Sequence, residues 1–461
     1  MRRVFESMES RNSRFTTVLA VGFLAAAGCR AEERADFGWT ARLSFSGQVD
    51  LVSEFHPGFH AAYSGANSVR PEREFATARV LTLSSGFRFS RSTDVQVDVE
   101  SVAGGGISNA LGLAGFANLD AARSPTPGRM PYLARFVLRQ VIGMGRKEPA
   151  SEEGETGPTL PVRRVELRFG KFSATDFFDL NSVSGDSRSQ FVNWTVDNNA
   201  AYDFAADTRG YTYGALVEFY DRGYTIRFME ALMPTAANGP ILDWTLARSR
   251  SENGELEIRG RFLKGRSGRL RLLGYANHGT LGSYREAVDQ FLSGITTLPD
   301  IEATRRAGRL RFGSGINIDQ YVTKSIQAFG RWGWNEGQNE SYAYSEVNHS
   351  LAAGLRFYGS RWKRGEDAVG ITMVSNGISG DHRRYLQAGG KGSLLGDSNL
   401  NYRREGTLEV YYSWRVRPGI AITPDIERVT NPGYNRDRGP VFVASLRMHL
   451  DIDRDWFRRF L

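Results

Sequence analysis

The sequence contains a single cysteine, Cys29, so it can form neither an internal disulfide framework nor a cysteine-ligated metal site. Lysine is also scarce, because six of the 59 basic residues are Lys and the other 53 are Arg. The guanidinium fork of Arg suits carboxylates, phosphates and vicinal hydroxyls, although a GC-rich genome would favour Arg equally. No nucleic-acid-binding motif accompanies the net charge of +8, so we expect no nucleic-acid partner.

The chain lacks long apolar runs apart from one at its start. Four arginines precede an apolar stretch at residues 15–27, and small residues follow it, which is the order of a secretory signal. We predict a signal peptide at 1–28. Cys29 follows Ala26-Ala27-Gly28, which is similar to a lipoprotein box, so Cys29 is a candidate lipidation site with simple cleavage as the alternative. No later run is long enough for a spanning helix, which leaves a periplasmic protein or an outer-membrane barrel.

Catalytic signatures are missing as well. The six histidines form no HExxH pattern, no G-x-S-x-G elbow occurs, and no glycine loop carries a P-loop lysine. We therefore expect no catalytic residues, no metal site and no cofactor. The alternative enzyme class is an outer-membrane barrel that hydrolyses lipids with a Ser and a His.

What the chain has in abundance is alternation of apolar and polar residues. In the run at 252–264, for example, Leu256 and Ile258 share one face while Glu257 and Arg259 share the other, which is typical of a β-strand. The pattern predicts about sixteen strands. They lie at about 41–55, 74–89, 95–99, 134–142, 165–169, 209–219, 223–232, 252–264, 268–277, 306–318, 321–333, 347–358, 367–376, 403–416, 418–430 and 439–450.

The predicted connections alternate between short and long along the chain. Short ones follow strands two, six, eight, ten and fourteen, and long ones follow strands three, five, seven, nine and thirteen. Bacterial outer-membrane barrels combine an even strand number with short periplasmic turns and long outer loops. Only a closed sheet can cross lipid, because it leaves no backbone edge unpaired. We therefore predict an all-β protein, with residues 29–461 forming one transmembrane antiparallel β-barrel in the outer membrane of a Gram-negative-type bacterium.

One predicted loop is unusually long and polar. Residues 173–208 are rich in Asp, Asn and Ser with interleaved aromatics, and they separate two strand-like runs. Such a segment inside a compact domain needs a functional reason. We expect it to fold back into the pore as a constriction loop.

Two separated stretches carry a family resemblance. The first lies within residues 405–450 and the second within 170–191. The matching residues are Glu409, Tyr411, Thr423, Pro424, Asp425, Asn431, Pro432, Gly433, Leu446 and Arg447, and then Gly170, Lys171, Phe172, Asp176, Phe178, Asp179, Asn181, Asp186, Gln190 and Phe191. Both resemble the carbohydrate-selective porin family (OprB type). The resemblance implies a sixteen-stranded outer-membrane porin for sugars.

Charge placement suggests where a solute would be selected. Acid on the infolded loop and base on the neighbouring wall would set a field across a narrow opening, a common device in pores. Arg and carboxylate pairs can donate to and accept from adjacent sugar hydroxyls. The candidate constriction residues are Arg135, Arg139, Arg164, Glu166, Arg168, Asp176, Asp179, Asp186 and Arg188. Phe177, Phe178, Trp194 and Tyr202 are candidates to stack on a sugar ring.

These observations predict passive diffusion of carbohydrates and similar small polar solutes. The alternatives are a porin for other solutes, the barrel hydrolase, and a structural barrel plugged by its own loops. The expected partners are outer-membrane lipid, small polar solutes and the barrel-assembly machinery. Oligomerisation is left open.

Overall fold

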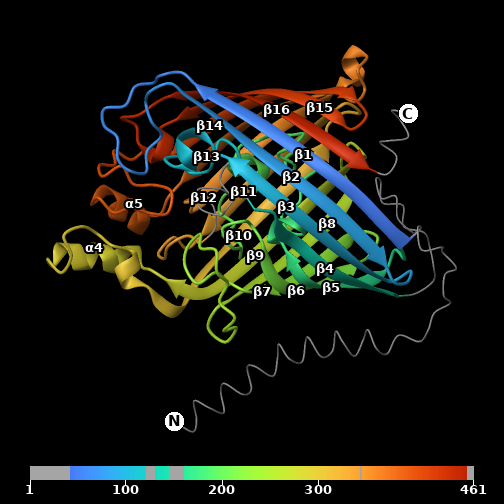
Figure 1. Ribbon diagram of the computed structural model, residues 1–461, viewed down its shortest axis with the longest axis horizontal. Helices are drawn as coiled ribbons and strands as arrows, with labels where there is room; N and C mark the ends of the chain where they lie inside the picture. Colours follow the sequence, from blue (N-terminus) through green and yellow to red (C-terminus); the bar gives the residue numbers. More distant parts are fainter. Residues whose placement is uncertain (1–41, 121–129, 145–159, 343–344, 454–461) are drawn as a thin grey trace, which may run out of the picture.

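Sixteen strands close into one antiparallel barrel in the computed structural model, which describes residues 42–120, 130–144, 160–342 and 345–453. Each strand pairs with the next along the chain, and β1 pairs with β16 to seal the sheet, as with Val49 opposite Leu450 (Figure 1). The predicted fold class is confirmed. The predicted signal peptide, Cys29 and most of the linker after β4 lie outside the described residues.

Most strands overlap the predicted runs, but β3 is longer than the predicted 95–99. The predicted turn between 318 and 321 was wrong, because β10 continues to Tyr321 and β11 begins at Ile326. The strands are β1 Leu43–His56, β2 Glu74–Arg88, β3 Thr93–Gly104, β4 Tyr132–Gly143, β5 Arg164–Phe172, β6 Thr212–Tyr220, β7 Tyr224–Ala231, β8 Arg250–Leu263, β9 Arg266–Leu281, β10 Arg306–Tyr321, β11 Ile326–Asn335, β12 His349–Tyr358, β13 Ala368–Gly377, β14 Glu405–Arg417, β15 Ile420–Thr430 and β16 Val441–Asp453.

The described residues also form short helices, all in connections. The α-helices are α3 Trp194–Asp197, α4 Tyr284–Leu292 and α5 Gly380–Gln387, and the 3-10 helices are Ile107–Ala110, Ala174–Asp176, Glu302–Thr304, Gly359–Trp362 and Pro432–Tyr434. In the described part of the chain, no helix is both long and apolar enough to cross a membrane.

The two faces of the sheet differ in the way a membrane barrel requires. On β15, Ile426 is 58% exposed, whereas its neighbours Asp425 and Glu427 are buried. On β7, Ile226 and Phe228 are exposed and the intervening Arg227 is buried. The apolar residues thus cover the outside and the charged residues line the inside, which is the reverse of a soluble sandwich.

Short turns gather at one end of the barrel and long loops at the other. The turns after β2, β6, β8, β10 and β14 are short, as predicted, and α4 and α5 sit in the long loops that follow β9 and β13 (Figure 1). Ser283 and Ser379 cap the two helices by accepting from the backbone N–H of Glu286 and His382. We call these the short-turn end and the long-loop end.

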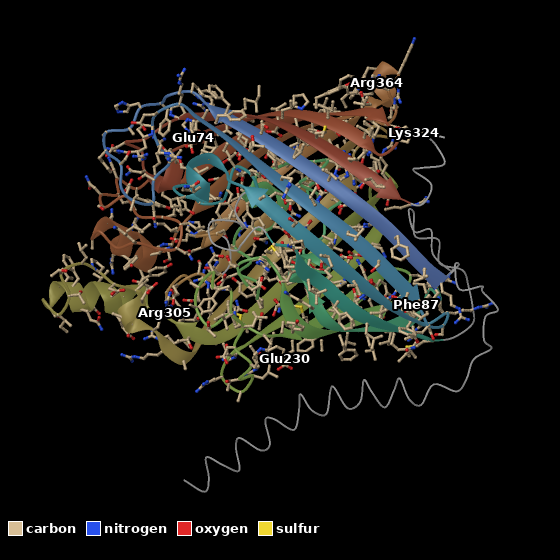
Figure 2. The ribbon with its side chains drawn as sticks, in the orientation of Figure 1. Glu74, Phe87, Glu230, Arg305, Lys324 and Arg364 are labelled. Atoms are coloured by element: carbon tan, nitrogen blue, oxygen red, sulfur yellow. The ribbon has the colours of Figure 1, made fainter. Side chains whose placement is uncertain are left out.

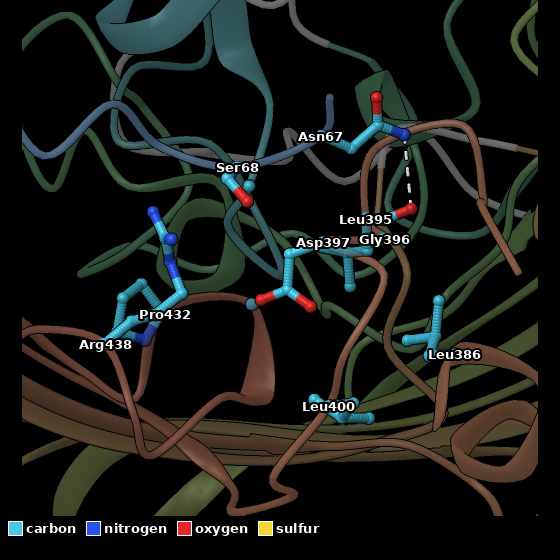
Figure 3. Close-up of a pocket in the computed structure, with 11 residues that line it drawn as sticks. Asn67, Ser68, Leu386, Leu395, Gly396, Asp397, Leu400, Pro432 and Arg438 are labelled. Atoms are coloured by element: carbon cyan, nitrogen blue, oxygen red, sulfur yellow. Dashed lines mark hydrogen bonds between the residues drawn. The ribbon is translucent and has the colours of Figure 1, made fainter. Parts of the chain in front are cut away.

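At the long-loop end, loops that are distant in sequence bind one another. The side-chain amide of Asn67, in the loop after β1, donates to two carbonyls in the loop after β13. One is that of Gly392 at 2.9 Å, and the other is that of Leu395 at 3.2 Å, which Figure 3 shows. Asn435, in the loop after β15, donates to the carboxylate of Asp397 at 2.7 Å. The loops therefore support one another over the mouth of the barrel.

Candidate functional site

The segment between β5 and β6 runs through the interior of the barrel. Its first turn is fixed by a capping box in which the backbone N–H of Ser173 donates to Asp176 at 3.0 Å. Further along, its residues bond to inward-facing side chains of strands on several sides of the barrel, including β1, β8, β10, β11, β14, β15 and β16. A segment that reaches strands on so many sides can do so only inside the lumen.

Asp179 is the most heavily bonded anchor of this segment. Its carboxylate accepts from the backbone N–H of Asn199 (2.9 Å) and the amide of Asn317 (2.8 Å), and it pairs with Arg331 at 2.8 Å. Its own N–H donates to Glu255 at 2.7 Å. Asp179 adopts a positive φ of 58°, which is uncommon for a residue with a side chain. These bonds join the start and the end of the segment to β8, β10 and β11.

The opposite wall holds the middle of the segment. The N–H of Val192 donates to Glu409 at 2.6 Å, and the amide of Asn193 donates to Glu427 at 2.6 Å. Arg188 pairs with Asp50 of β1 at 3.0 Å. Burial alone would lower the pKa of Arg188, but the nearby carboxylates of Asp120 and Asp50 outweigh it and raise the pKa. Arg188 is therefore a permanent cation that ties the segment to the wall.

A second infolded segment lies beside the first, and the sequence did not predict it. Residues 105–120, after β3, bond to the first segment where the N–H of Trp194 donates to the carbonyl of Phe116 at 3.0 Å. The N–H of Ala114 donates to Glu405 of β14 at 3.0–3.1 Å. From the sequence we predicted only a glycine-rich loop here. Its small and apolar residues and its few charges distinguish it from a loop that faces solvent, and they could have indicated that it folds inward.

The aromatic residues of the two segments form an apolar cluster inside the barrel. Phe178, Trp194 and Tyr202 are at most 4% exposed. The hydroxyl of Tyr202 donates to Asn253 of β8 at 2.8 Å, and burial raises the pKa of Tyr202 well above its usual range. These three rings are packed against protein and offer no face to a sugar, which corrects their expected role. Phe177 stays half-buried.

The predicted wall residues form a continuous ladder of ion pairs across β3 to β6. Glu166 bonds to Arg164 and to Arg168, each at 2.6 Å, and Arg168 also pairs with Glu218 of β6. Arg139 pairs with Asp94 of β3 at 2.8 Å. Alternate residues of neighbouring strands face the same side, so the pattern places all these charges on the lumen face.

Arg135 connects this ladder to the infolded segment. Its guanidinium donates two bonds to the carboxylate of Asp176, at 2.7 and 2.6 Å, and a third at 3.3 Å to Asp98 of β3. Two parallel bonds between Arg and a carboxylate fix direction as well as distance. The predicted meeting of loop acid and wall base is therefore present at Arg135 and Asp176.

Water reaches some of the predicted residues and not others. The side chains of Arg135, Arg139 and Asp176 are 23–24% exposed, and that of Arg188 is 27% exposed. In contrast, Arg164, Glu166 and Asp179 are at most 4% exposed. Asp186 closes a local turn, where it accepts from the hydroxyl of Ser189 and the N–H of Arg188. The buried members and Asp186 therefore support the structure, whereas Arg135, Arg139, Asp176 and Arg188 are reached by water.

The sequence missed several charged partners on the wall. Asp94, Gln96 and Asp98 alternate along β3 and face the lumen, where Gln96 is exposed. Glu218 completes the ladder on β6. These residues could have been found from the alternation that predicted the strands. Its polar positions mark the face that lines the lumen, just as its apolar positions mark the face that meets lipid.

A closed sixteen-stranded sheet with an apolar exterior, a charged interior and an infolded loop defines a porin-type β-barrel. Such a barrel belongs in the outer membrane of a Gram-negative bacterium.

A family model described as "Carbohydrate-selective porin, OprB family" matches residues 66–451, and the chain belongs to this family. The protein is thus an outer-membrane porin for carbohydrates.

The barrel fold is also that of one solved structure. The high-pH structure of Pseudomonas putida OprB superposes with a TM-score of 0.65 at 15% identity and covers 89% of this chain and 94% of that one. Pseudomonas aeruginosa OccK11 (OpdR) covers 89% and 96%, with a TM-score of 0.43 and 9% identity. A mutant of the Rh. blastica porin covers 89% and 100%, with a TM-score of 0.44 and 6% identity. No curated protein matches the sequence.

Proposed function

We propose that sugars pass along the β3–β5 wall, between the exposed arginines of that wall and the start of the infolded segment. The observation that carries this proposal is the division of the lumen by exposure. Arg135, Arg139 and Asp94 of the wall are reached by water, whereas the aromatic cluster and the anchors at Asp179 are enclosed by protein. Solute follows water, so the passage runs beside the exposed charges.

The chemistry of this wall suits a multiply hydroxylated solute. Arg donates and a carboxylate accepts, and a sugar hydroxyl does both. A sugar hydroxyl can break the bond between Arg139 and Asp94 and replace it with two bonds, one accepted from the guanidinium and one donated to the carboxylate. Neither charge is then left without a hydrogen-bond partner. An apolar solute of equal size would break the same bonds and return none.

Phe177 adds an apolar surface at the edge of this passage. The guanidinium of Arg168 lies 5.0 Å from its ring centroid, and the ring of Phe172 packs edge-on at 5.4 Å. A half-buried ring fixed on two sides by packing offers the flat apolar surface that the C–H face of a sugar needs. We assign it the stacking role that the enclosed aromatics cannot fill.

The test is liposome swelling with purified protein that carries Arg139→Gln and Asp94→Asn together. Removal of this exposed pair should change the ratio of sugar flux to flux of an uncharged, less hydroxylated solute of similar size by roughly two- to fivefold. Arg428→Gln is the matched control, since Arg428 is exposed on the outer face of β15. An unchanged ratio in the double variant would show that solutes pass elsewhere.

A plugged structural barrel is the second candidate, and one observation favours it. Two infolded segments and their buried aromatic cluster occupy the lumen. Single-channel recording in planar bilayers separates the two: a porin gives stable conductance steps, and a plugged barrel gives none. A lipase assay on the same preparation tests the barrel hydrolase.

We also propose that residues 1–28 direct export, that the barrel-assembly machinery inserts the chain, and that Cys29 is a candidate for lipidation. Intact-mass measurement of the mature chain tests the first and last points. Signal cleavage without lipid gives the bare polypeptide mass, and lipidation adds the mass of the attached lipid at Cys29. Native mass spectrometry in detergent determines whether the barrels associate.

A further inference from the structure

Arginines on the lumen wall are paired with carboxylates almost everywhere that the structure describes them. Arg271 bonds to Glu257 and Asp319, both at 2.8 Å, and Arg311 bonds to Asp203 at 2.7 Å. Pairing is expected, because an unpaired buried charge is costly. A group of partly or fully exposed cations without carboxylate partners is a different feature, because it concentrates positive charge and favours an anion.

Such a group lies at the short-turn end, between the turn that joins β8 to β9 and the turn that joins β10 to β11. A shallow cavity of about 310 Å³, wide open to solvent, lies there. Figure 2 shows Lys324 at the same end of the barrel as Arg364, far from Glu74 and Arg305. The lining residues are Arg261, Gly265, Arg266, Ser267, Tyr321, Thr323 and Lys324.

The three cations of this cavity have no acidic partner. Among the described residues, none of Arg261, Arg266 and Lys324 makes an ion pair, and the lining contains no carboxylate. The Nε of Arg266 is buried and has no hydrogen-bond partner within the described part of the chain. A buried guanidinium N–H without an acceptor leaves a bond unmade, and a bound anion would supply that acceptor.

Two of the lining residues lie at lumen-facing positions of β9 and β10. Tyr321 shares the strand face of Asp319, and Ser267 shares that of Arg271; Arg271 and Asp319 pair with each other inside the barrel. In outer-membrane barrels the short turns face the periplasm. The cavity thus lies at the end where a solute would leave the passage. The ladder residues Asp94 and Arg164 are near this same end, but on β3 and β5 and not on β8 to β11.

We propose that this cavity binds a phosphate group, either as free phosphate or as part of a phosphorylated sugar. Two guanidinium groups and one ammonium supply the charge for a dianion, and Arg is suited to two parallel bonds with phosphate oxygens. The hydroxyls of Ser267 and Thr323 add neutral donors. A neutral sugar would leave the three positive charges uncompensated, whereas a phosphate dianion offsets two of them and accepts from the Nε of Arg266.

Binding is tested on the full-length protein in detergent by ³¹P NMR titration, with inorganic phosphate and glucose 6-phosphate as the two probes and glucose as competitor. The variant carries Arg261→Gln, Arg266→Gln and Lys324→Gln. The control carries Arg361→Gln and Lys363→Gln, exposed cations of the turn after β12 that do not line the cavity. Lys324→Gln alone, at an exposed turn position, guards against misfolding of the triple variant.

We expect the triple variant to weaken phosphate binding at least tenfold and the single variant to weaken it about threefold, with the control unchanged. Tighter binding of glucose 6-phosphate than of free phosphate identifies a phosphorylated sugar as the ligand, and the reverse order identifies phosphate. Equal affinity in wild type and triple variant, or an equal loss in the control, overturns the site. Competition by glucose at the same concentration also overturns it, since the site would then recognise the sugar and not the phosphate.

This inference rests on the proposed function only in that the lumen conducts solutes. Its failure is distinguishable, because the triple variant should leave glucose flux in liposome swelling unchanged, whereas the variant at Arg139 and Asp94 should alter sugar flux and leave phosphate binding intact. A loss in one assay without the other identifies which assignment is wrong.

Discussion

Replacement of Asp179 by Ala should release the infolded segment from the barrel wall. The carboxylate holds the N–H of Asn199, the amide of Asn317 and the guanidinium of Arg331 at 2.8–2.9 Å. Both members of the Asp179–Arg331 pair are 2% exposed, so solvent does not screen the loss. Removal of one partner of a buried pair costs about 3–5 kcal/mol, which shifts the ratio of docked to released segment by a factor between roughly one hundred and a few thousand.

The assay is single-channel recording, with liposome swelling for size exclusion. A released segment no longer narrows the lumen, so Asp179→Ala should raise the conductance, increase the current noise and admit larger oligosaccharides. The barrel itself should stay folded, because its strand ladders do not involve the Asp179 side chain. Retention of heat-modifiable migration in gels confirms this.

A second variant separates charge from shape. Asp179→Asn removes the charge opposite Arg331 but keeps a side-chain oxygen that can accept from Asn199 and Asn317. This variant should therefore retain part of the docking free energy and give less current noise than Asp179→Ala. Wild-type conductance and size exclusion in the folded Asp179→Ala protein would refute the reasoning, because the segment would then be held by its other contacts alone.

Two further predictions concern the fold around the passage. Gly170→Ala should reduce the yield of folded barrel in a heat-modifiability assay. Gly170 has φ +131°, and an added Cβ would lie 1.9 Å from the carbonyl oxygen of Phe136. Gly223→Ala is the control and should leave the yield unchanged, because no atom lies within 4 Å of its added Cβ. His382→Ala removes a ring stacked on Tyr284 at 4.2 Å, so limited proteolysis should cut the loops of α4 and α5 several-fold faster, and unchanged cleavage would show that the stack does not hold them.

The barrel could be predicted because the requirement that forms it acts on neighbouring residues along each strand. A strand that separates lipid from water must alternate, and Ile426 between Asp425 and Glu427 shows this within three residues. The connections between strands could also be predicted, because glycine and polar residues interrupt the alternation there. Closure of β1 on β16 follows from an even count and from the cost of an open edge in lipid.

The interior was harder to predict because burial inside a pore has no periodic signal. The polar segment at 173–208 was recognised by its length, but nothing in its sequence distinguishes Phe177, which stays half-buried, from Phe178, which is fully enclosed. That difference depends on which side of the chain faces the second infolded segment at 105–120. A segment that packs against another segment within the lumen need not place apolar residues toward lipid or polar residues toward water. Alternation in its sequence therefore does not predict which of its side chains are buried.

The charged residues of the lumen therefore serve two tasks that the sequence cannot separate. Glu409 and Glu427 use their carboxylates to hold backbone and side-chain donors of the infolded segment at 2.6 Å, as a core would. The guanidinium of Arg139 and the carboxylate of Asp94, in contrast, bond to each other and are reached by water. Both kinds lie on the same face of the same sheet, and only the position of the infolded segments decides which is which. On the proposed function a passage of stable width needs both, because the exposed pairs could select a solute only while the buried ones keep the opposite side of the opening in place.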